Sequence, residues 1–163
     1  MLPGIRTQEI KKLPDERGFF AEGMRADWVD FLEGDTIVQA NVSMSYPGMI
    51  RAWHRHRRGQ VDYFVVVRGA MKICAYDDEP GSPTKGELSE VITSSEKLQV
   101  VRIPGKYWHG TKTVSPEPSL TFYMVNRLYD YKNPDEDRRP WNDPAIVEAK
   151  SGQVWDWNRP PHK

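Results

Sequence analysis

The sequence predicts an all-β fold in a single domain. Short apolar or alternating runs, separated by Pro, Gly, Asp and Ser, recur along all 163 residues, whereas no window sustains a helical period of about 3.6 residues. About a dozen short strands at this spacing are typical of a sandwich or a barrel. A chain of this length can bury about two thirds of its unfolded surface around one core, so no second domain is needed.

The N-terminal part is predicted to contain one helix among strands. Leu2 to Ile10 is expected to form a strand, and Asp15 to Phe20 a turn that leads into another. Arg25 to Glu33 is expected to form a short helix. Its apolar face would carry three large side chains: Trp28, Phe31 and Leu32.

Alternation is cleanest from Thr36 to Ser45. The apolar side chains of this strand share one face, which we expect to pack into the core: Val38, Ala40, Val42 and Met44. Gln39, Asn41 and Ser43 fall on the other face. Amides at successive inward positions suit hydrogen bonds to a ligand, but a solvent-facing strand has the same pattern, so both interpretations stay open.

The second half of the chain is predicted to continue as short strands. Asp62 to Val67 and Ala70 to Tyr76 are expected to pair as a hairpin around Arg68-Gly69. Further strands are expected after the loop that ends at Gly86: Glu87 to Thr93, Leu98 to Ile103, a piece after His109, and Ser119 to Asn126. Residues 129–163 are expected to form a C-terminal loop and tail over the body, with Trp155 and Trp157 packing back.

Composition narrows the class of function. Lys and Arg number 23, as do Asp and Glu, which argues against a partner bound through overall charge, such as nucleic acid or a membrane surface. Cys74 is the single cysteine, so a disulfide framework is excluded. The first residues lack a signal-like apolar segment, and no run approaches the ~18 apolar residues of a membrane span. We therefore expect a cytoplasmic protein.

Four residues predict a reactive site. His54 and His56 lie two apart on one predicted strand and so share a face, Asp62 lies on the next strand, and His109 follows Pro104-Gly105. The alternative is a pair of surface histidines in a basic loop. The pattern resembles the cupin signature, in which two histidines, an acid and a third histidine bind a divalent metal. His54, His56, Asp62 and His109 are thus an alternative metal-ligand set.

Seven motifs together resemble one family of metal-free cupins. They occur in order: Asp15-Glu16-Arg17-Gly18-Phe19-Phe20-Ala21-Glu22, Gln39-Ala40-Asn41, Arg51-Ala52-Trp53-His54 with Gln60, Arg68-Gly69, Ser82-Pro83-Thr84-Lys85-Gly86, Ile103-Pro104 with His109-Gly110, and Trp141-Asn142-Asp143-Pro144-Ala145-Ile146. The chain resembles the dTDP-4-dehydrorhamnose 3,5-epimerase family over residues 15–146. The resemblance implies a cupin double-stranded β-helix, or jelly roll, spanning residues 1–163. It also implies a homodimer, no cofactor, and a nucleoside-diphosphate sugar, most simply a dTDP sugar, as the small-molecule partner.

The family's reaction gives roles to the candidate catalytic residues. A proton next to the C4 ketone of a 4-keto-6-deoxy sugar is removed, an enolate forms, and a proton returns to C3 or C5 on the opposite face. By resemblance His54 is the base, and its neutral imidazole suits proton abstraction near neutral pH. His109 would stand beside the enolate oxygen. Tyr123 is the candidate acid, with a buried structural tyrosine as the alternative.

Other matched positions imply contacts with the nucleotide. Arg17 and Arg51 correspond to residues that hold the diphosphate, and Arg17 would reach the site of a neighbouring subunit. Gln39 and Asn41 match positions at the nucleotide end. Either Tyr129 or Tyr131 would stack on the base. Two further residues of the matched motifs are assigned to substrate binding: Glu22 and Gln60.

Departures from the family keep other functions open. The family's enolate-stabilising lysine is replaced by Asp62, so that role would pass to His56, Arg57 or Arg58. The family's base-orienting aspartate lies beyond this chain, and Asp62 or Asp156 would have to substitute for it. Three alternatives follow: a sugar-nucleotide 3,4-ketoisomerase, a metal-dependent cupin enzyme, and an inactive sugar-nucleotide binding protein.

Overall fold

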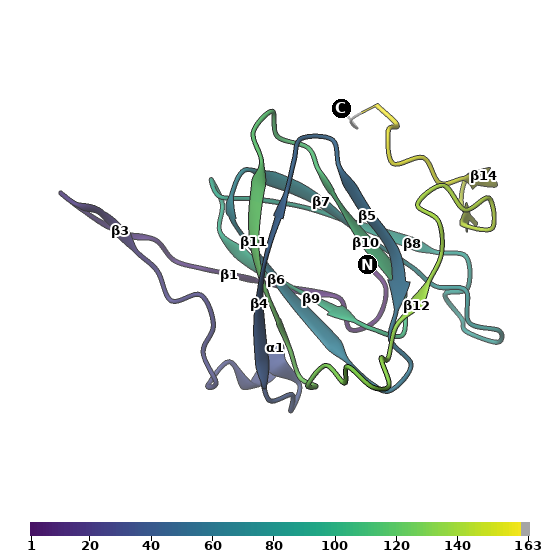
Figure 1. The fold of residues 1–163 in the computed structure, drawn as a ribbon, viewed down its shortest axis with the longest axis horizontal. Helices are drawn as coiled ribbons and strands as arrows, with labels where there is room; N and C mark the ends of the chain where they lie inside the picture. The colour runs from purple at the N-terminus through teal and green to yellow at the C-terminus, as the bar shows by residue number, and fades with distance from the viewer. Residues whose placement is uncertain (161–163) are drawn as a thin grey trace.

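The chain forms two five-stranded antiparallel sheets that face each other (Figure 1). The computed structural model describes residues 1–160. The first sheet has the order β1 (Arg6–Glu9), β9 (Gln99–Pro104), β6 (Val61–Arg68), β11 (Ser119–Val125), β4 (Gln39–Ser45). The second has the order β12 (Asp137–Arg138), β5 (Ile50–Arg55), β10 (Trp108–Thr113), β7 (Ala70–Tyr76), β8 (Leu88–Ser94). This two-sheet jelly roll confirms the all-β, single-domain prediction.

Two small ribbons and one helical turn complete the fold. β2 (Leu13–Asp15) and β3 (Gly18–Phe20) pair as a hairpin, as do β13 (Val147–Glu148) and β14 (Gln153–Val154). The helix α1 spans Val29–Leu32 and so is shorter than expected. Among residues 1–160, no helix is long and apolar enough to cross a membrane.

The interior between the sheets is packed at one end only. There, side chains of both sheets meet in a core that includes Phe64, Ile73 and Ile103. A second cluster covers the outer face of the first sheet, where Phe31 and Leu32 of α1 contact Tyr63 of β6. The remaining end of the barrel is not filled by apolar side chains and holds the cavity described below.

The C-terminal tail packs against the second sheet, as expected. Trp155 and Trp157 are 5% and 1% exposed, and they join Trp53, Cys74 and Trp108 in a third cluster. This tail confirms the prediction that both tryptophans pack back onto the body. The last three residues of the predicted tail lie outside the described residues.

The predicted hairpin around Gly69 is wrong. β6 pairs with β9 and β11 in the first sheet, whereas β7 pairs with β10 and β8 in the second. The chain passes from one sheet to the other at Gly69, whose φ of 71° suits glycine. A hairpin and a crossover between sheets can both be short glycine-containing connections between two apolar strands. The sequence pattern alone therefore did not separate them.

The orientation predicted for β4 is also wrong. Val38, Val42 and Met44 are 45%, 62% and 50% exposed, so the apolar face of this edge strand points outward. Gln39 and Asn41 face the cavity instead. The inward face is polar because it lines a cavity rather than a packed core, and this resolves the two interpretations of the amides in favour of inward placement.

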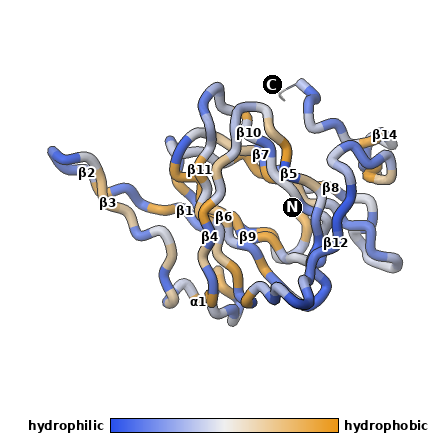
Figure 2. Tube along the Cα trace, in the orientation of Figure 1, coloured by the Kyte–Doolittle hydropathy of each residue, from blue (hydrophilic) through white to orange (hydrophobic). Residues whose placement is uncertain are grey.

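The β2–β3 hairpin projects away from the body (Figure 1). Its apolar residues Phe19 and Phe20 are 55% and 63% exposed. Figure 2 shows this apolar stretch far from the cores of the two sheets. Arg17 lies at the turn of this arm.

Candidate active site

A cavity of about 610 Å³ opens between the sheets at the end that the core leaves unfilled. Strands of both sheets contribute to its wall, and so does the segment that follows β11. The polar and aromatic lining residues include Gln39, Asn41, Arg51, His54, His56, Gln60, Asp62, Tyr123, Arg127, Tyr129, Tyr131, Glu136, Arg138 and Arg139. Most of the predicted site residues thus surround one space.

Three histidine rings meet at the cavity. β5 and β10 are neighbours, and their register places His54 directly opposite His109. The ring centroids of these two lie 4.3 Å apart, and His56 lies 5.5 Å from His109 and 6.0 Å from His54. The prediction that His54 and His56 share a face with His109 nearby is confirmed.

Asp62 connects two of these rings. Its Oδ2 lies 2.8 Å from Nε2 of His109 and 3.5 Å from Nε2 of His56, while the Gln60 amide donates to Oδ1 at 2.8 Å. Burial alone would raise the pKa of Asp62, but hydrogen bonds from His109 and His56 outweigh it and hold that pKa well below its ordinary range. The carboxylate is therefore ionised.

Both ring nitrogens of His109 lie within hydrogen-bond distance of an acceptor. Nδ1 faces the carbonyl oxygen of Tyr107 at 2.9 Å, and Nε2 faces Asp62. Both nitrogens are therefore engaged by the protein. The side chain is fully buried, and in this arrangement neither nitrogen points into the cavity as a donor for substrate.

The two other rings differ in protonation. Burial lowers the pKa of His54 well below its ordinary value, and the neighbouring His109 adds to this effect. Among the described residues, neither ring nitrogen of His54 has a hydrogen-bond partner. For His56, burial would lower the pKa, but the Asp62 carboxylate and the carbonyl of Asp135, which accepts from Nδ1, raise it. The pKa of His54 is thus lowered and that of His56 is raised, although the two rings lie on the same wall of the cavity.

Three of the four alternative metal ligands lie together. Ligand atoms of His56, Asp62 and His109 fall within 4.8 Å of one another, and His54 is outside this group. Two ligands of a tetrahedral zinc ion would stand about 3.3 Å apart, whereas His109 and Asp62 are hydrogen-bonded at 2.8 Å. The group is arranged as a hydrogen-bond network, and an ion would have to break its shortest contact.

Tyr123 lies across the cavity from the histidines, on β11. It pairs with Asn41 of β4, and its ring stacks on Phe64 at 5.9 Å between centroids. Burial raises the pKa of the phenol, and the Asp62 charge adds to the effect. A half-buried, protonated phenol therefore faces the space that His54 faces from the other sheet.

Polar and aromatic groups line the outer part of the cavity. Gln39 donates to Asn41 at 2.8 Å and accepts from the backbone of Tyr129 at 2.9 Å. Arg51 donates to the Ser45 hydroxyl at 2.8 Å. The rings of Tyr129 and Tyr131 lie edge to face at 5.0 Å.

Several predicted residues lie outside this cavity. Arg17 is on the projecting arm, paired with Asp15 and 81% exposed in its side chain. Glu22 pairs with Arg25. Three residues considered as replacements for the missing family groups also point elsewhere: Arg57 bonds Asp137, Arg58 bonds Asp135 and Asn133, and Asp156 is exposed and caps Asn158. Of those replacements, only His56 and Asp62 are in the cavity.

Sequence reasoning missed the role of the segment from 135 to 139, which it placed within the C-terminal loop and tail. β12 joins the edge of the second sheet, with Arg138 opposite His54. Glu136 and Arg138 line the cavity and form an ion pair at 2.8 Å. The sequence signal for this strand was the alternation of Glu136 and Arg138 with Asp137, which is typical of a strand with one solvent-exposed face.

Comparison with known proteins agrees with this geometry. Residues 1–151 match the profile of dTDP-4-dehydrorhamnose 3,5-epimerases. The chain belongs to the dTDP-4-dehydrorhamnose 3,5-epimerase family. It is accordingly a sugar-nucleotide epimerase, an isomerase, and the predicted family and enzyme class are confirmed.

Relatives in this family include proteins of glycan synthesis. A probable low-salt glycan biosynthesis epimerase, Agl13 of Haloferax volcanii, is 43% identical over 86% of this chain and 91% of its own length. The spore coat polysaccharide biosynthesis protein SpsL of Bacillus subtilis is 34% identical over 90% and 94%. The crystal structure of a Legionella pneumophila 3,5-epimerase in complex with dTDP-4-keto-L-rhamnose superposes with a TM-score of 0.79, at 30% identity, covering 89% of this chain and 77% of that one. The cupin jelly roll is thereby confirmed.

Proposed function

We propose that this family member epimerises a dTDP-linked 4-keto-6-deoxy sugar at C3, C5 or both, with His54 as the base. The observation that carries the assignment is the setting of the His54 ring. Burial lowers its pKa, its nitrogens form no hydrogen bond to the described residues, and it lines the cavity. A neutral imidazole is the form that accepts a proton from carbon.

Tyr123 is the proposed acid that returns the proton. Its raised pKa keeps the phenol protonated at neutral pH. It stands on the first sheet, and His54 stands on the second, so a sugar ring between them has one group on each side. Inversion at a ring carbon requires that a proton is removed from one face of the ring and returned to the other face.

Charge on the enolate oxygen would be balanced by His56, beside Asp62. The family lysine is absent, and His56 has a raised pKa and faces the cavity. His109 would act by holding Asp62 in place rather than by a direct hydrogen bond to substrate, since both of its nitrogens are engaged. This differs from the direct contact that the resemblance implies.

The nucleotide would occupy the outer part of the cavity. Gln39 and Asn41 offer amides, Arg51 offers a guanidinium fork for the diphosphate, and Tyr129 or Tyr131 a face for the base. The Legionella relative is described in complex with dTDP-4-keto-L-rhamnose, which supports a dTDP sugar as the ligand here. Gln60 would contribute indirectly, by a hydrogen bond that holds the Asp62 carboxylate in place.

A homodimer would complete the site. The exposed apolar face of β4 and the exposed phenylalanines of the β2–β3 arm suit contact with a second copy. Arg17 and Glu22 lie on or next to this arm, so they would serve the partner's cavity rather than their own. We further propose that the enzyme acts in the cytoplasm.

Proton NMR of dTDP-4-keto-6-deoxyglucose with the protein in deuterium oxide tests the reaction. Deuterium at C3 or C5 with the ketone still at C4 is expected. A ketone moved to C3 would show a 3,4-ketoisomerase instead. Binding of the sugar nucleotide without deuterium exchange would show an inactive binding protein. A stoichiometric bound metal whose removal abolishes activity would show a metal-dependent enzyme.

A further inference from the structure

One segment ties the cavity wall to a charged cluster on the far side of the second sheet. Residues 135–139, here named the strap, run along the edge strand β5. Arg138 pairs with His54 in register, and Arg139 exchanges two backbone hydrogen bonds with Trp53, both 3.0 Å long. The strap is therefore an extra edge strand placed beside the proposed base.

The inner side of the strap belongs to the cavity. Glu136 and Arg138 line it. The carbonyl oxygen of Asp135 accepts the Nδ1 hydrogen of His56, and the Asp135 carboxylate accepts the backbone N–H groups of Arg57 and Arg58 at 2.9 and 2.8 Å. The orientation of His56 thus depends on where the strap lies.

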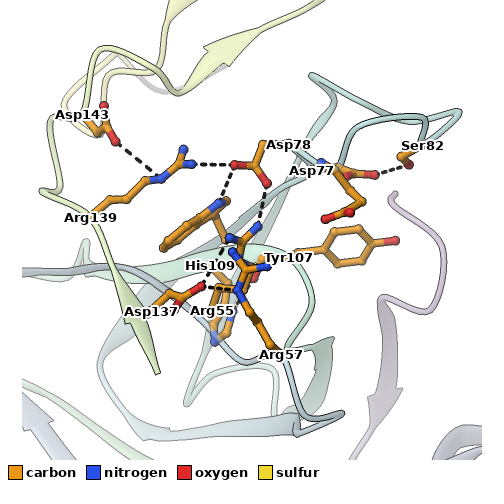
Figure 3. Close-up of polar contacts among 12 residues, drawn as sticks. Arg55, Arg57, Asp77, Asp78, Ser82, Tyr107, His109, Asp137, Arg139 and Asp143 are labelled. Carbon is orange, nitrogen blue, oxygen red and sulfur yellow. Dashed lines mark hydrogen bonds and ion pairs between the residues drawn. The ribbon is translucent and has the colours of Figure 1, made fainter. Parts of the chain in front are cut away.

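Asp78 anchors the other end of the strap (Figure 3). This residue lies on the loop after β7, and its carboxylate accepts three hydrogen bonds from side chains: Arg139 Nη2 at 2.6 Å, Arg55 Nη1 at 2.8 Å and Trp108 Nε1 at 2.8 Å. Both guanidinium groups also lie on the Trp108 ring, 4.3 and 4.2 Å from its centroid. Two cations thus share one ring and one carboxylate.

The remaining carboxylates are poorer partners for these two cations. Asp137 lies 3.3 Å from Arg55 but forms its short contact, 2.6 Å, with Arg57. Asp143 lies 3.7 Å from Arg139. The Arg55 side chain is 7% exposed, and its Nε already lacks a partner among the described residues. Without Asp78 the two guanidiniums would repel each other across Trp108, and the strap end is the part free to move.

We propose that Asp78 is a positioning residue for epimerisation, which acts by holding the strap against β5 so that His56, Glu136 and Arg138 keep their places around the substrate. The inference rests on the proposed function, because the strap matters for catalysis only if the cavity is the epimerase site. Asp78 does not itself line the cavity, but it bonds Arg139, which does. Its effect passes through Arg139.

Asp78→Asn is the direct test, with Glu79→Gln as the matched control. Glu79 is an exposed neighbour on the same loop, so its variant removes one negative charge without touching the cluster. We expect backbone amides of residues 135–141 to exchange with deuterium at least tenfold faster in Asp78→Asn than in the control. We also expect kcat to fall about 10- to 100-fold while KM changes less, since small displacements around a reacting centre cost this much.

Arg139→Gln is the second variant. It releases the strap end but keeps the contact between Arg55 and Asp78, so it preserves the more buried ion pair. If Asp78 acts through Arg139, the double variant loses no more activity than Asp78→Asn alone. Additive losses together with a parallel fall in melting temperature would show a merely structural role and overturn the proposal.

The outcomes separate this inference from the proposed function. Unchanged amide exchange in the strap of Asp78→Asn, or unchanged kcat, overturns the inference while the wild-type enzyme still epimerises. If the wild-type protein places no deuterium at C3 or C5 of the sugar, the proposed function is overturned. The proposed role of the strap in catalysis is then overturned as well.

Discussion

Nε2 of His109 lies 2.8 Å from Oδ2 of Asp62, in a buried hydrogen bond at the position where the family resemblance implies a lysine. The pair places a negative charge where a positive one is expected. Nε2 of His109 and Nε2 of His56 both face this carboxylate, at 2.8 and 3.5 Å. This arrangement supplies the setting in which His54 stays neutral.

Replacing Asp62 with Asn should weaken both folding and catalysis. The amide keeps the shape but removes the charge that supports His109 and His56. Breaking a buried charge pair costs about 3 kcal/mol or more, so the free energy of unfolding should fall by that amount in urea titration. The rate of deuterium incorporation should fall about 100-fold. Unfolding and exchange both at wild-type values would show that the Asp62 charge has neither role.

The acid limb of the pH profile should lie lower than for an ordinary histidine. Burial depresses the pKa of His54 in the folded enzyme, so the neutral base persists as the pH falls through about 6.5, the ordinary histidine value. The acid limb of kcat/KM should therefore begin only below about pH 6.5. Intrinsic tryptophan fluorescence at each pH checks that the protein remains folded. An acid limb centred above 6.5 would contradict a neutral, buried base.

Tyr123→Phe should separate proton removal from inversion. The ring and its stack on Phe64 remain, whereas the proton for the opposite face is lost. Deuterium exchange with retained configuration should continue, and net formation of the epimer should fall about 100-fold. Tyr46→Phe, in an exposed tyrosine that does not line the cavity, serves as the control. Equal loss of exchange and inversion would instead make Tyr123 a binding residue.

Val42→Asp should break the proposed dimer. Val42 is 62% exposed on the apolar face of β4, and a carboxylate buried there against a second copy would be strongly unfavourable. Light scattering should give a dimer for the wild type and a monomer for the variant. Ile92→Asp, on β8 and 52% exposed, is the matched control and should stay dimeric. A wild-type monomer, or a dimer in both variants, would remove β4 as the interface.

The sequence predicted the strand content and the meeting of the three histidines because both follow from local rules. Alternation on β5 fixes the face of His54 and His56, and the cupin-like order brings His109 beside them. The face of β4 that turns inward could not be predicted, because a polar face that lines a cavity and a polar face that meets solvent have the same sequence pattern. The crossover at Gly69 and the edge pairing of Arg138 depend on which strands meet. The alternation around Arg138 indicates a strand but does not specify the strand with which it pairs.

The most direct test of the account is the rate at which His54→Asn incorporates deuterium into dTDP-4-keto-6-deoxyglucose. If His54 is the base, the rate should fall by at least about 1,000-fold, while dTDP affinity by calorimetry and the melting temperature stay close to wild type. A variant that folds, binds dTDP and still exchanges within tenfold of the wild-type rate would show that another group removes the proton, and would contradict the account.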